Sequence, residues 1–170
     1  MTGCRPSQGA GANASSRWDR VPPSWPLREH SRFVEAGGLR WHVQVLGAGA
    51  PLLLVHGTGA AAHSWAAPAR LLAADFQTIL PDLPGHGFTA LPSVAGMSLP
   101  GMATGLAALL ERLGVEPALV AGHSAGAAVL ARMALDGRIA PRALLSFNGA
   151  LLPLRGMAGQ LFSPLAKVVA

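Results

Sequence analysis

Short apolar runs alternate with amphipathic stretches from residue 51 to residue 149, and this alternation predicts most of the fold. Continuous apolar runs bounded by turn residues are typical of buried strands, whereas apolar residues that recur every third or fourth position are typical of helices. The chain therefore predicts strands at 51–56, 76–82, 117–123 and 142–149, and helices at 64–76, 98–114 and 124–136, each with a serine at its start. Strands and helices in alternation indicate a parallel α/β sheet with right-handed crossovers.

Residues 31–46 carry a different pattern, which predicts a β-hairpin. Arg32–Ala36 and Leu39–Leu46 form the two strands, and Gly37-Gly38 is the turn between them. Apolar and polar residues alternate in the second strand, which predicts one buried face and one face toward water. The buried set is Trp41, Val43 and Val45, and the wet set is His42 and Gln44.

The two ends of the chain differ from its middle. Residues 1–25 are polar and lack an apolar period, which predicts a disordered arm, and Pro22–Pro26 predicts a stiff, extended segment. Residues 151–170 are apolar but interrupted by proline and glycine, which favours the start of a lid over a site. Peripheral contact with a membrane surface is the alternative for this tail. The expected domains are an arm at 1–25, an α/β domain at 26–150 and the start of a cap at 151–170.

Composition narrows the class of protein. Hydrophobic residues make up 51% of the chain and the mean hydropathy is +0.38, yet no apolar run approaches the ~18 to 20 residues that a membrane span needs. The formal net charge is +5, but the arginines are scattered, so nucleic-acid binding is not expected. A single cysteine and the lack of a secretory apolar segment predict a cytoplasmic protein without an internal disulfide.

The pentapeptide Gly122-His123-Ser124-Ala125-Gly126 carries the clearest sign of chemistry. It is G-x-S-x-G at the junction of a predicted buried strand and a predicted helix, which is the context that a nucleophile elbow requires. In such an elbow the serine backbone is strained, and the helix N-terminus favours developing negative charge. Ser124 is therefore the predicted nucleophile. The alternative is an ordinary serine N-cap.

A second glycine-rich motif, VHGTG at residues 55–59, ends the first of the predicted parallel strands. In acyl transfer, one oxyanion donor is the backbone N–H after the nucleophile, here Ala125, and the other comes from the loop after an earlier strand, here Thr58. Gly57 and Gly59 let this backbone approach a substrate closely. Alone, the motif is typical of a glycine turn; together with the elbow, it predicts an oxyanion hole.

The stretch DLPGHGFT at residues 82–89 completes a set of three motifs. Their order, H-G-x-G, then D-x-P-G-x-G, then G-x-S-x-G, resembles the α/β-hydrolase superfamily over residues 31–150. The resemblance implies a mainly parallel sheet with helices on both faces and a cap after strand six, so the chain is expected to be truncated after that strand. In the resembled fold the loop of His86 lies at the mouth of the site. A turn histidine with a local packing role is the favoured interpretation of His86, because most titratable loop residues are not catalytic; contact with a substrate or a metalloporphyrin is the alternative.

Four longer stretches carry a second, closer resemblance: SRFVEAGGLRWHVQ, DLPGHGFT, GHSAGAAVLARMALDG and FNGALLPLRGMAGQLFSPLAK. They are similar to the family of magnesium-chelatase accessory proteins of bacteriochlorophyll biosynthesis, from about residue 21 to residue 170. The resemblance implies a hydrolase-like accessory protein that assists magnesium insertion into protoporphyrin. Its expected partners are a small apolar or porphyrin-like ligand and magnesium chelatase subunits. No cofactor is required and no metal site is expected, because the scattered histidines lack ligand spacing.

A Ser-His-Asp triad is incomplete in this chain. The superfamily order is Ser, then acid, then His, but Asp136 is the only carboxylate after Ser124, and all six histidines precede that serine. Asp136 lies at the far end of the predicted helix, ~18 Å away, and is not the acid. Two explanations stay open. Either the chain is a fragment of the accessory factor or of a serine hydrolase of small esters, lactones or amides, or it is complete and non-catalytic. The unpaired apolar strand at 142–149 favours a fragment.

Overall fold

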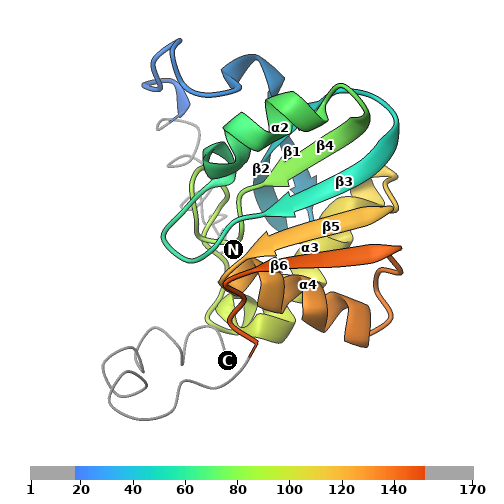
Figure 1. Ribbon diagram of the computed structural model, residues 1–170. Coiled ribbons are helices and arrows are strands. Elements are labelled where there is room, and N and C mark those ends of the chain that lie inside the picture. Colours follow the sequence, from blue (N-terminus) through green and yellow to red (C-terminus); the bar gives the residue numbers. More distant parts are fainter. Residues whose placement is uncertain (1–17, 152–170) are drawn as a thin grey trace, which may run out of the picture.

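A six-stranded sheet organises the protein in the computed structural model, which describes residues 18–151 (Figure 1). The strands are β1 (Ser31–Ala36), β2 (Leu39–Leu46), β3 (Ala50–Val55), β4 (Phe76–Pro81), β5 (Leu119–His123) and β6 (Ala143–Phe147). The helices are α2 (Ala66–Leu72), α3 (Leu99–Leu113) and α4 (Ala125–Leu135), with short 3-10 helices η1 (Arg28–His30), η2 (Ala62–Trp65) and η3 (Ala95–Met97). The strand order is β1-β2-β4-β3-β5-β6. The hairpin β1–β2 pairs antiparallel with β4, and β4, β3, β5 and β6 are parallel to one another.

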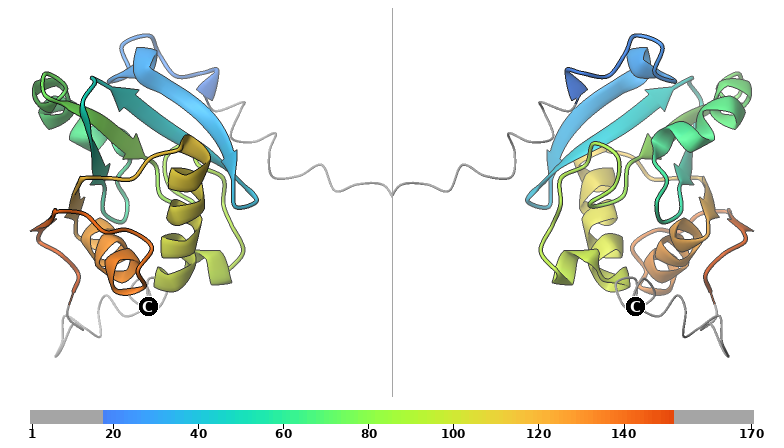
Figure 2. Two further views of the ribbon diagram at one scale, coloured as in Figure 1. Left: turned by 90° about the vertical axis from the view of Figure 1, so that its right-hand side faces the viewer. Right: turned by 90° about the vertical axis from the view of Figure 1, so that its left-hand side faces the viewer.

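Helices cover both faces of this sheet, as Figure 2 shows from two sides. In β3, Leu52 and Leu54 pack with α2, whereas Leu53 and Val55 pack with α3 and α4. Because both faces of the strand are buried, it needs apolar residues at every position, which explains its continuous apolar run. The predicted α/β fold with helices on both faces is confirmed.

Helix α3 begins and ends where the sequence predicts. The Ser98 hydroxyl accepts the N–H of Gly101 at 3.2 Å, an N-cap of the ordinary kind. At the other end Gly114 takes a left-handed conformation with φ 66°, which glycine adopts without a steric penalty. Local sequence signals are sufficient to place this helix.

The hairpin is confirmed, but the prediction of a wet face on its second strand is wrong. His42 and Gln44 are only 1% and 0% exposed. The side-chain amide of Gln44 donates to the carbonyls of Pro26 and Leu27 at 2.8 and 3.1 Å, and the ring of Trp18 lies 5.1 Å from that of His42. The chain before the hairpin therefore folds over this face and binds part of its polar groups.

Residues 18–25, the described part of the expected arm, form turns and not a stiff, extended segment. Backbone hydrogen bonds of 3.0 Å join Val21 to Trp18 and Trp25 to Pro22. The ring of Trp18 packs edge-on against Phe88 at 5.0 Å. Packing of aromatic side chains offsets the ordering cost of this segment, which its average polarity did not indicate.

The first predicted helix also starts differently. Residues 62–65 form η2, and α2 begins only at Ala66. The Ser64 hydroxyl donates to the carbonyl of Ala61 at 2.7 Å, so the prediction that Ser64 caps a helix is wrong. The Asp82 carboxylate accepts the Ala62 N–H at 2.6 Å. A residue distant in sequence therefore replaces the local cap.

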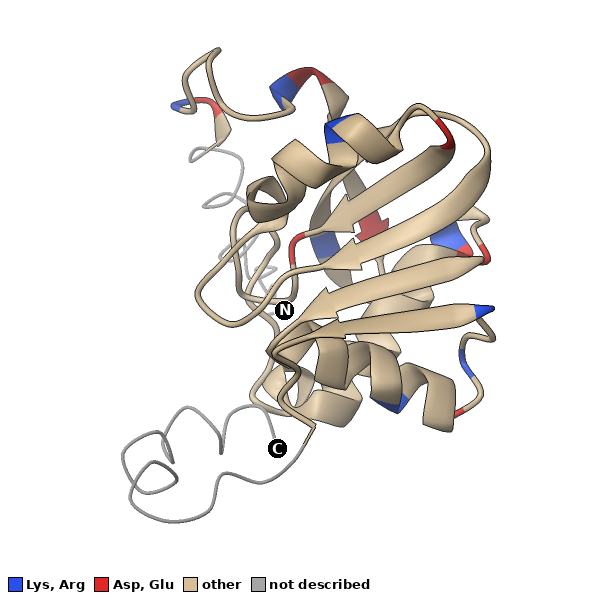
Figure 3. Cartoon of the chain, viewed as in Figure 1, with Lys and Arg blue, Asp and Glu red and all other residues tan. Residues whose placement is uncertain are grey.

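The expectations for residues 1–17 and for the cap from residue 152 lie outside the described residues. Between residues 18 and 151, no helix is long and apolar enough to cross a membrane. In Figure 3 the basic residues lie apart from one another, mostly in loops and at the ends of elements. Strands β3 to β6 carry no Lys, Arg, Asp or Glu.

Candidate active site

The turn between β5 and α4 has the geometry of a nucleophile elbow. Ser124 adopts φ 51° and ψ −116°, a conformation that costs roughly 1–3 kcal/mol in a residue other than glycine. Its N–H donates to the carbonyl of Phe147 at 2.9 Å, which fixes the turn against β6. The flanking glycines have no room for a side chain. A Cβ atom on Gly122 would collide with the backbone of Ala127, and one on Gly126 with the carbonyl of Val55.

The side chain of Ser124 is not an N-cap. Although Ser124 stands at the N-cap position of α4, its hydroxyl makes no capping hydrogen bond, so the alternative interpretation of this serine is wrong. The residue is partly exposed. Within residues 18–151, no histidine ring hydrogen-bonds to this hydroxyl. The described residues therefore fix the backbone of Ser124 but do not hydrogen-bond to its hydroxyl.

The glycine-rich loop after β3 lies directly against the elbow. A Cβ atom placed on Gly57 would stand 3.0 Å from the Ser124 Cβ and 2.9 Å from the His123 Nδ1. Thr58 and Gly59 follow on the surface. Neither the Thr58 N–H nor the Ala125 N–H has an acceptor within residues 18–151. The structure therefore brings the two predicted donor segments together beside the serine.

His56 links this loop to the next one. Its Nε2 accepts the N–H of Leu83 at 2.9 Å, so the proton lies on Nδ1, which donates to the carbonyl of Gly57 at 2.8 Å. Burial lowers the pKa of His56 from 6.5 to about 4, because desolvation disfavours the charged imidazolium. A neutral His56 with both nitrogens bonded therefore holds the glycine-rich loop against the loop after β4.

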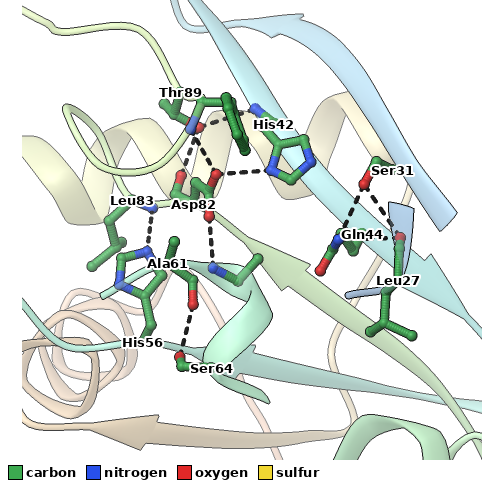
Figure 4. A network of polar contacts seen from close by, with 12 residues as sticks. Leu27, Ser31, His42, Gln44, His56, Ala61, Ser64, Asp82, Leu83 and Thr89 are labelled. Atoms are coloured by element: carbon green, nitrogen blue, oxygen red, sulfur yellow. Dashed lines mark hydrogen bonds and ion pairs between the residues drawn. The ribbon is translucent and has the colours of Figure 1, made fainter. Parts of the chain in front are cut away.

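Asp82 is the polar residue that sequence reasoning missed. It follows β4 and is 1% exposed. Its carboxylate binds the His42 Nδ1 at 2.8 Å, the Ala62 N–H at 2.6 Å and the Phe88 N–H at 2.8 Å (Figure 4). Gly87 passes so close to the carboxylate that a Cβ atom there would overlap it. Asp82 thus joins β2, η2 and the 83–89 loop. In the sequence, a lone aspartate at the end of an apolar strand was the signal that could have predicted this buried role.

The electrostatics of Asp82 agree with this structural role. Burial alone would raise the pKa of its carboxyl group. The hydrogen bond and the charge of His42, together with the N–H groups of Ala62 and Phe88, outweigh burial and hold the pKa below its ordinary value. The carboxylate is therefore ionised, and both of its oxygens accept hydrogen bonds from the fold.

His86 lies at the same end of the sheet. Its Nδ1 is 3.0 Å from the carbonyl of Pro84, and its ring is 5.3 Å from the ring of His56. The residue is partly buried. The local packing that the sequence favours is thus present, while one ring nitrogen, Nε2, has no partner within residues 18–151.

Asp136 is engaged elsewhere, at the end of α4. Its carboxylate accepts hydrogen bonds from Arg132 at 2.9 Å and lies 3.6 Å from Arg138. The hydrogen bond from Arg132 lowers the pKa of Asp136. These contacts agree with the prediction that Asp136 is not a triad acid.

Two hollows bounded by the described residues lie away from Ser124. One of about 690 Å³ is lined by Leu110 and Ile139, and one of about 700 Å³ by Gly37 and Leu91, among others. Neither includes the elbow or the glycine loop. Residues 18–151 also hold no group of three or more His, Cys, Asp or Glu side chains that could bind a metal ion. Ser124 and the glycine-rich loop after β3 thus form one side of the candidate site, which we call its floor.

The strained serine, the adjoining glycine loop and the mainly parallel sheet define the class of protein. Residues 50–147 match the alpha/beta hydrolase fold family, and the chain belongs to that family.

Relatives refine this assignment. The magnesium-chelatase 30 kDa subunit of Rhodobacter capsulatus is 38% identical over 152 residues, which cover 88% of this chain and 53% of that protein. Fluoroacetate dehalogenase of Burkholderia sp. is 36% identical over 109 residues, or 62% of this chain and 36% of that protein. Among solved structures, N-formylmaleamic acid deformylase of Pseudomonas putida S16 matches with a TM-score of 0.63 at 31% identity, over 74% of this chain and 48% of that one. The chain spans about half the length of the chelatase subunit.

Proposed function

We propose that the protein is an accessory protein that assists magnesium insertion into protoporphyrin in bacteriochlorophyll biosynthesis. The observation that carries this proposal is the 38% identity to the magnesium-chelatase subunit, which extends over 88% of the chain. The dehalogenase matches a shorter part of the chain, 62%. The proposed partners are a porphyrin-like ligand and magnesium chelatase subunits.

The geometry supports a ligand at the carboxyl end of the parallel strands. Ser124 presents a hydroxyl there, and Thr58 and Ala125 present N–H groups, none of which has a partner within residues 18–151. Ligands of α/β sheets bind at this end of the strands. These polar groups would bind a carboxylate or carbonyl oxygen of the ligand, while the flat apolar part lies above them.

A pigment titration tests this function. The protein, as its source cells make it, is titrated with protoporphyrin and with magnesium protoporphyrin while the visible absorbance is followed. We expect saturable spectral shifts at micromolar pigment. The absence of any shift with either pigment would count against the proposal.

A second candidate function is hydrolysis of a small ester, lactone or amide. The observation that favours it is the strained backbone of Ser124 between β5 and α4, the conformation typical of a nucleophile elbow. In this mechanism Ser124 attacks the carbonyl carbon, and the Thr58 and Ala125 N–H groups stabilise the oxyanion. The base and the acid would come from outside residues 18–151.

A fluorophosphonate probe separates the two candidates. If the protein is a hydrolase, the probe labels the wild type rapidly, and Ser124→Ala abolishes labelling. A non-catalytic accessory protein binds pigment and is not labelled. Equal labelling of the wild type and the alanine variant would exclude Ser124 as the nucleophile.

A further inference from the structure

We infer that the Nε2 atom of His86 coordinates the central magnesium ion of a magnesium porphyrin as its axial ligand. This inference rests on the proposed function, because that function brings a magnesium porphyrin to the protein. The porphyrin nitrogens hold the metal in the plane and leave an axial position open. A neutral imidazole fills that position with a lone pair, and the step transfers no electron.

The imidazole of His86 is prepared for this role. Its Nδ1–H donates to the carbonyl of Pro84 at 3.0 Å, so the lone pair lies on Nε2. A histidine that binds a metal commonly donates its other ring N–H to a carbonyl or carboxylate, which fixes the tautomer and the ring orientation. The Nε2 atom has no hydrogen-bond partner within residues 18–151, and the side chain is partly exposed. Solvent or a ligand can therefore reach it.

The backbone around His86 is held as firmly as the ring. The His86 N–H donates to Leu83 at 2.9 Å, and the His86 carbonyl accepts the Thr89 N–H at 3.0 Å. The Phe88 N–H binds the buried Asp82 carboxylate at 2.8 Å. A ligand atom on a loop restrained in this way loses little conformational freedom when the metal binds.

The location of His86 also fits a ligand above the elbow. Its ring lies 5.3 Å from the ring of His56, the residue before Gly57, and Gly57 lies against Ser124. His86 and Ser124 therefore border the same floor. A flat pigment across this floor would reach the imidazole with its centre and the polar groups at Ser124 with its edge.

The other histidines fit the role less well. His56 uses both ring nitrogens and is buried. His42 has a free Nε2, but it is 1% exposed beneath the rings of Trp18 and Phe88. The remaining three, His30, His63 and His123, are partly or fully exposed, and no hydrogen bond within residues 18–151 orients their rings.

The test compares magnesium protoporphyrin with metal-free protoporphyrin, because only the first has a position for an axial ligand. Dissociation constants are measured for the protein as its source cells make it, for His86→Ala and for the matched control His63→Ala. In the wild type we expect the magnesium pigment to bind about tenfold tighter, which corresponds to about 1.4 kcal/mol. The preference should vanish in His86→Ala, persist in His63→Ala and return to His86→Ala when free imidazole is added.

Resonance Raman spectra of the bound magnesium pigment give a second readout. We expect the wild type to show an imidazole-ligated magnesium and His86→Ala to show a different axial ligand. Metal-free pigment should bind to both with equal affinity, which controls for folding of the variant. An unchanged magnesium preference in His86→Ala, or its loss in His123→Ala instead, would overturn the inference and leave the proposed function standing. A wild type that binds neither pigment would overturn both.

Discussion

Asp82 and Ser124 follow parallel strands of the same sheet, but they use their polar atoms in opposite ways. The Asp82 carboxylate is buried and binds His42, Ala62 and Phe88. The Ser124 hydroxyl binds no helix N–H, and its backbone is held at φ 51°. One residue contributes its polar atoms to the fold, whereas the hydroxyl of the other makes no hydrogen bond within residues 18–151.

The contrast between Asp82 and Ser124 shows how the fold supports a strained residue. Strain of roughly 1–3 kcal/mol at a serine persists only when the surrounding structure fixes it. Here β6 holds the Ser124 N–H, and His56 joins the glycine loop to the loop that Asp82 anchors.

Replacing Asp82 should have the largest effect on stability. In Asp82→Asn the buried His42 loses its charged partner and at least one buried N–H loses its best acceptor, so the free energy of unfolding should fall by about 3–5 kcal/mol. Urea unfolding of the two proteins at neutral pH measures the change. Asp136→Asn, which weakens only the surface ion pairs with Arg132 and Arg138, is the matched control and should unfold like the wild type.

The protein should lose stability in mildly acidic solution, because His56 binds a proton more readily in the unfolded chain than in the folded protein. The pKa of His56 is about 4 in the folded protein and 6.5 as its ordinary value. Between these values the unfolded chain takes up a proton that the folded protein does not, so the free energy of unfolding falls as the pH falls. The loss should approach roughly 3 kcal/mol at pH 4.

Unfolding curves between pH 7 and pH 4 measure this slope. His56→Gln can still accept the Leu83 N–H but does not titrate, so its stability should depend less on pH in this range. The same slope in the variant and the wild type would show that another group controls the acid response.

A side chain at Gly126 should damage the elbow more than one at a control glycine. Gly126→Ala drives a Cβ atom into the carbonyls of Val55 and His56, and overpacking of this kind costs about 1–3 kcal/mol or more. Gly38 has a positive φ, but a Cβ atom there meets no atom within 4 Å, so Gly38→Ala should cost only about 1 kcal/mol, from backbone strain alone. If the two variants lose equal amounts of stability in thermal unfolding, the close packing assigned to the elbow is wrong.

Relief of strain at Ser124 should give the smallest effect. Ser124→Gly removes the Cβ atom from a positive-φ position and should stabilise the protein by about 1 kcal/mol relative to Ser124→Ala. Both variants lack the hydroxyl, so the difference between their free energies of unfolding isolates the cost of the backbone conformation. Identical melting temperatures would show that the conformation of Ser124 is not strained.

Much of the fold and the elbow could be predicted from the sequence, because their signals are local. The continuous apolar runs mark strands buried on both faces, and Ser98 and Gly114 mark the ends of α3. Gly122 and Gly126 mark a turn without room for side chains. In each case, neighbouring residues determine the structure.

The parts that could not be predicted depend on residues distant in sequence. His42 looked like a solvent-facing residue because its partners, Asp82 and Trp18, lie on other segments. Ser64 looked like a helix cap because the carboxylate that binds the Ala62 N–H comes from Asp82. Alternation along one strand indicates which residues share a face, but not which segment covers that face.

The measurement that tests the central claim most directly is the rate at which purified magnesium chelatase inserts magnesium into protoporphyrin, with and without this protein. The protein is used as its source cells make it, in excess over the chelatase, with an unrelated protein of similar charge as the control. We expect a rate several-fold higher when the protein is present. A rate that stays unchanged at saturating protein would contradict the proposed function.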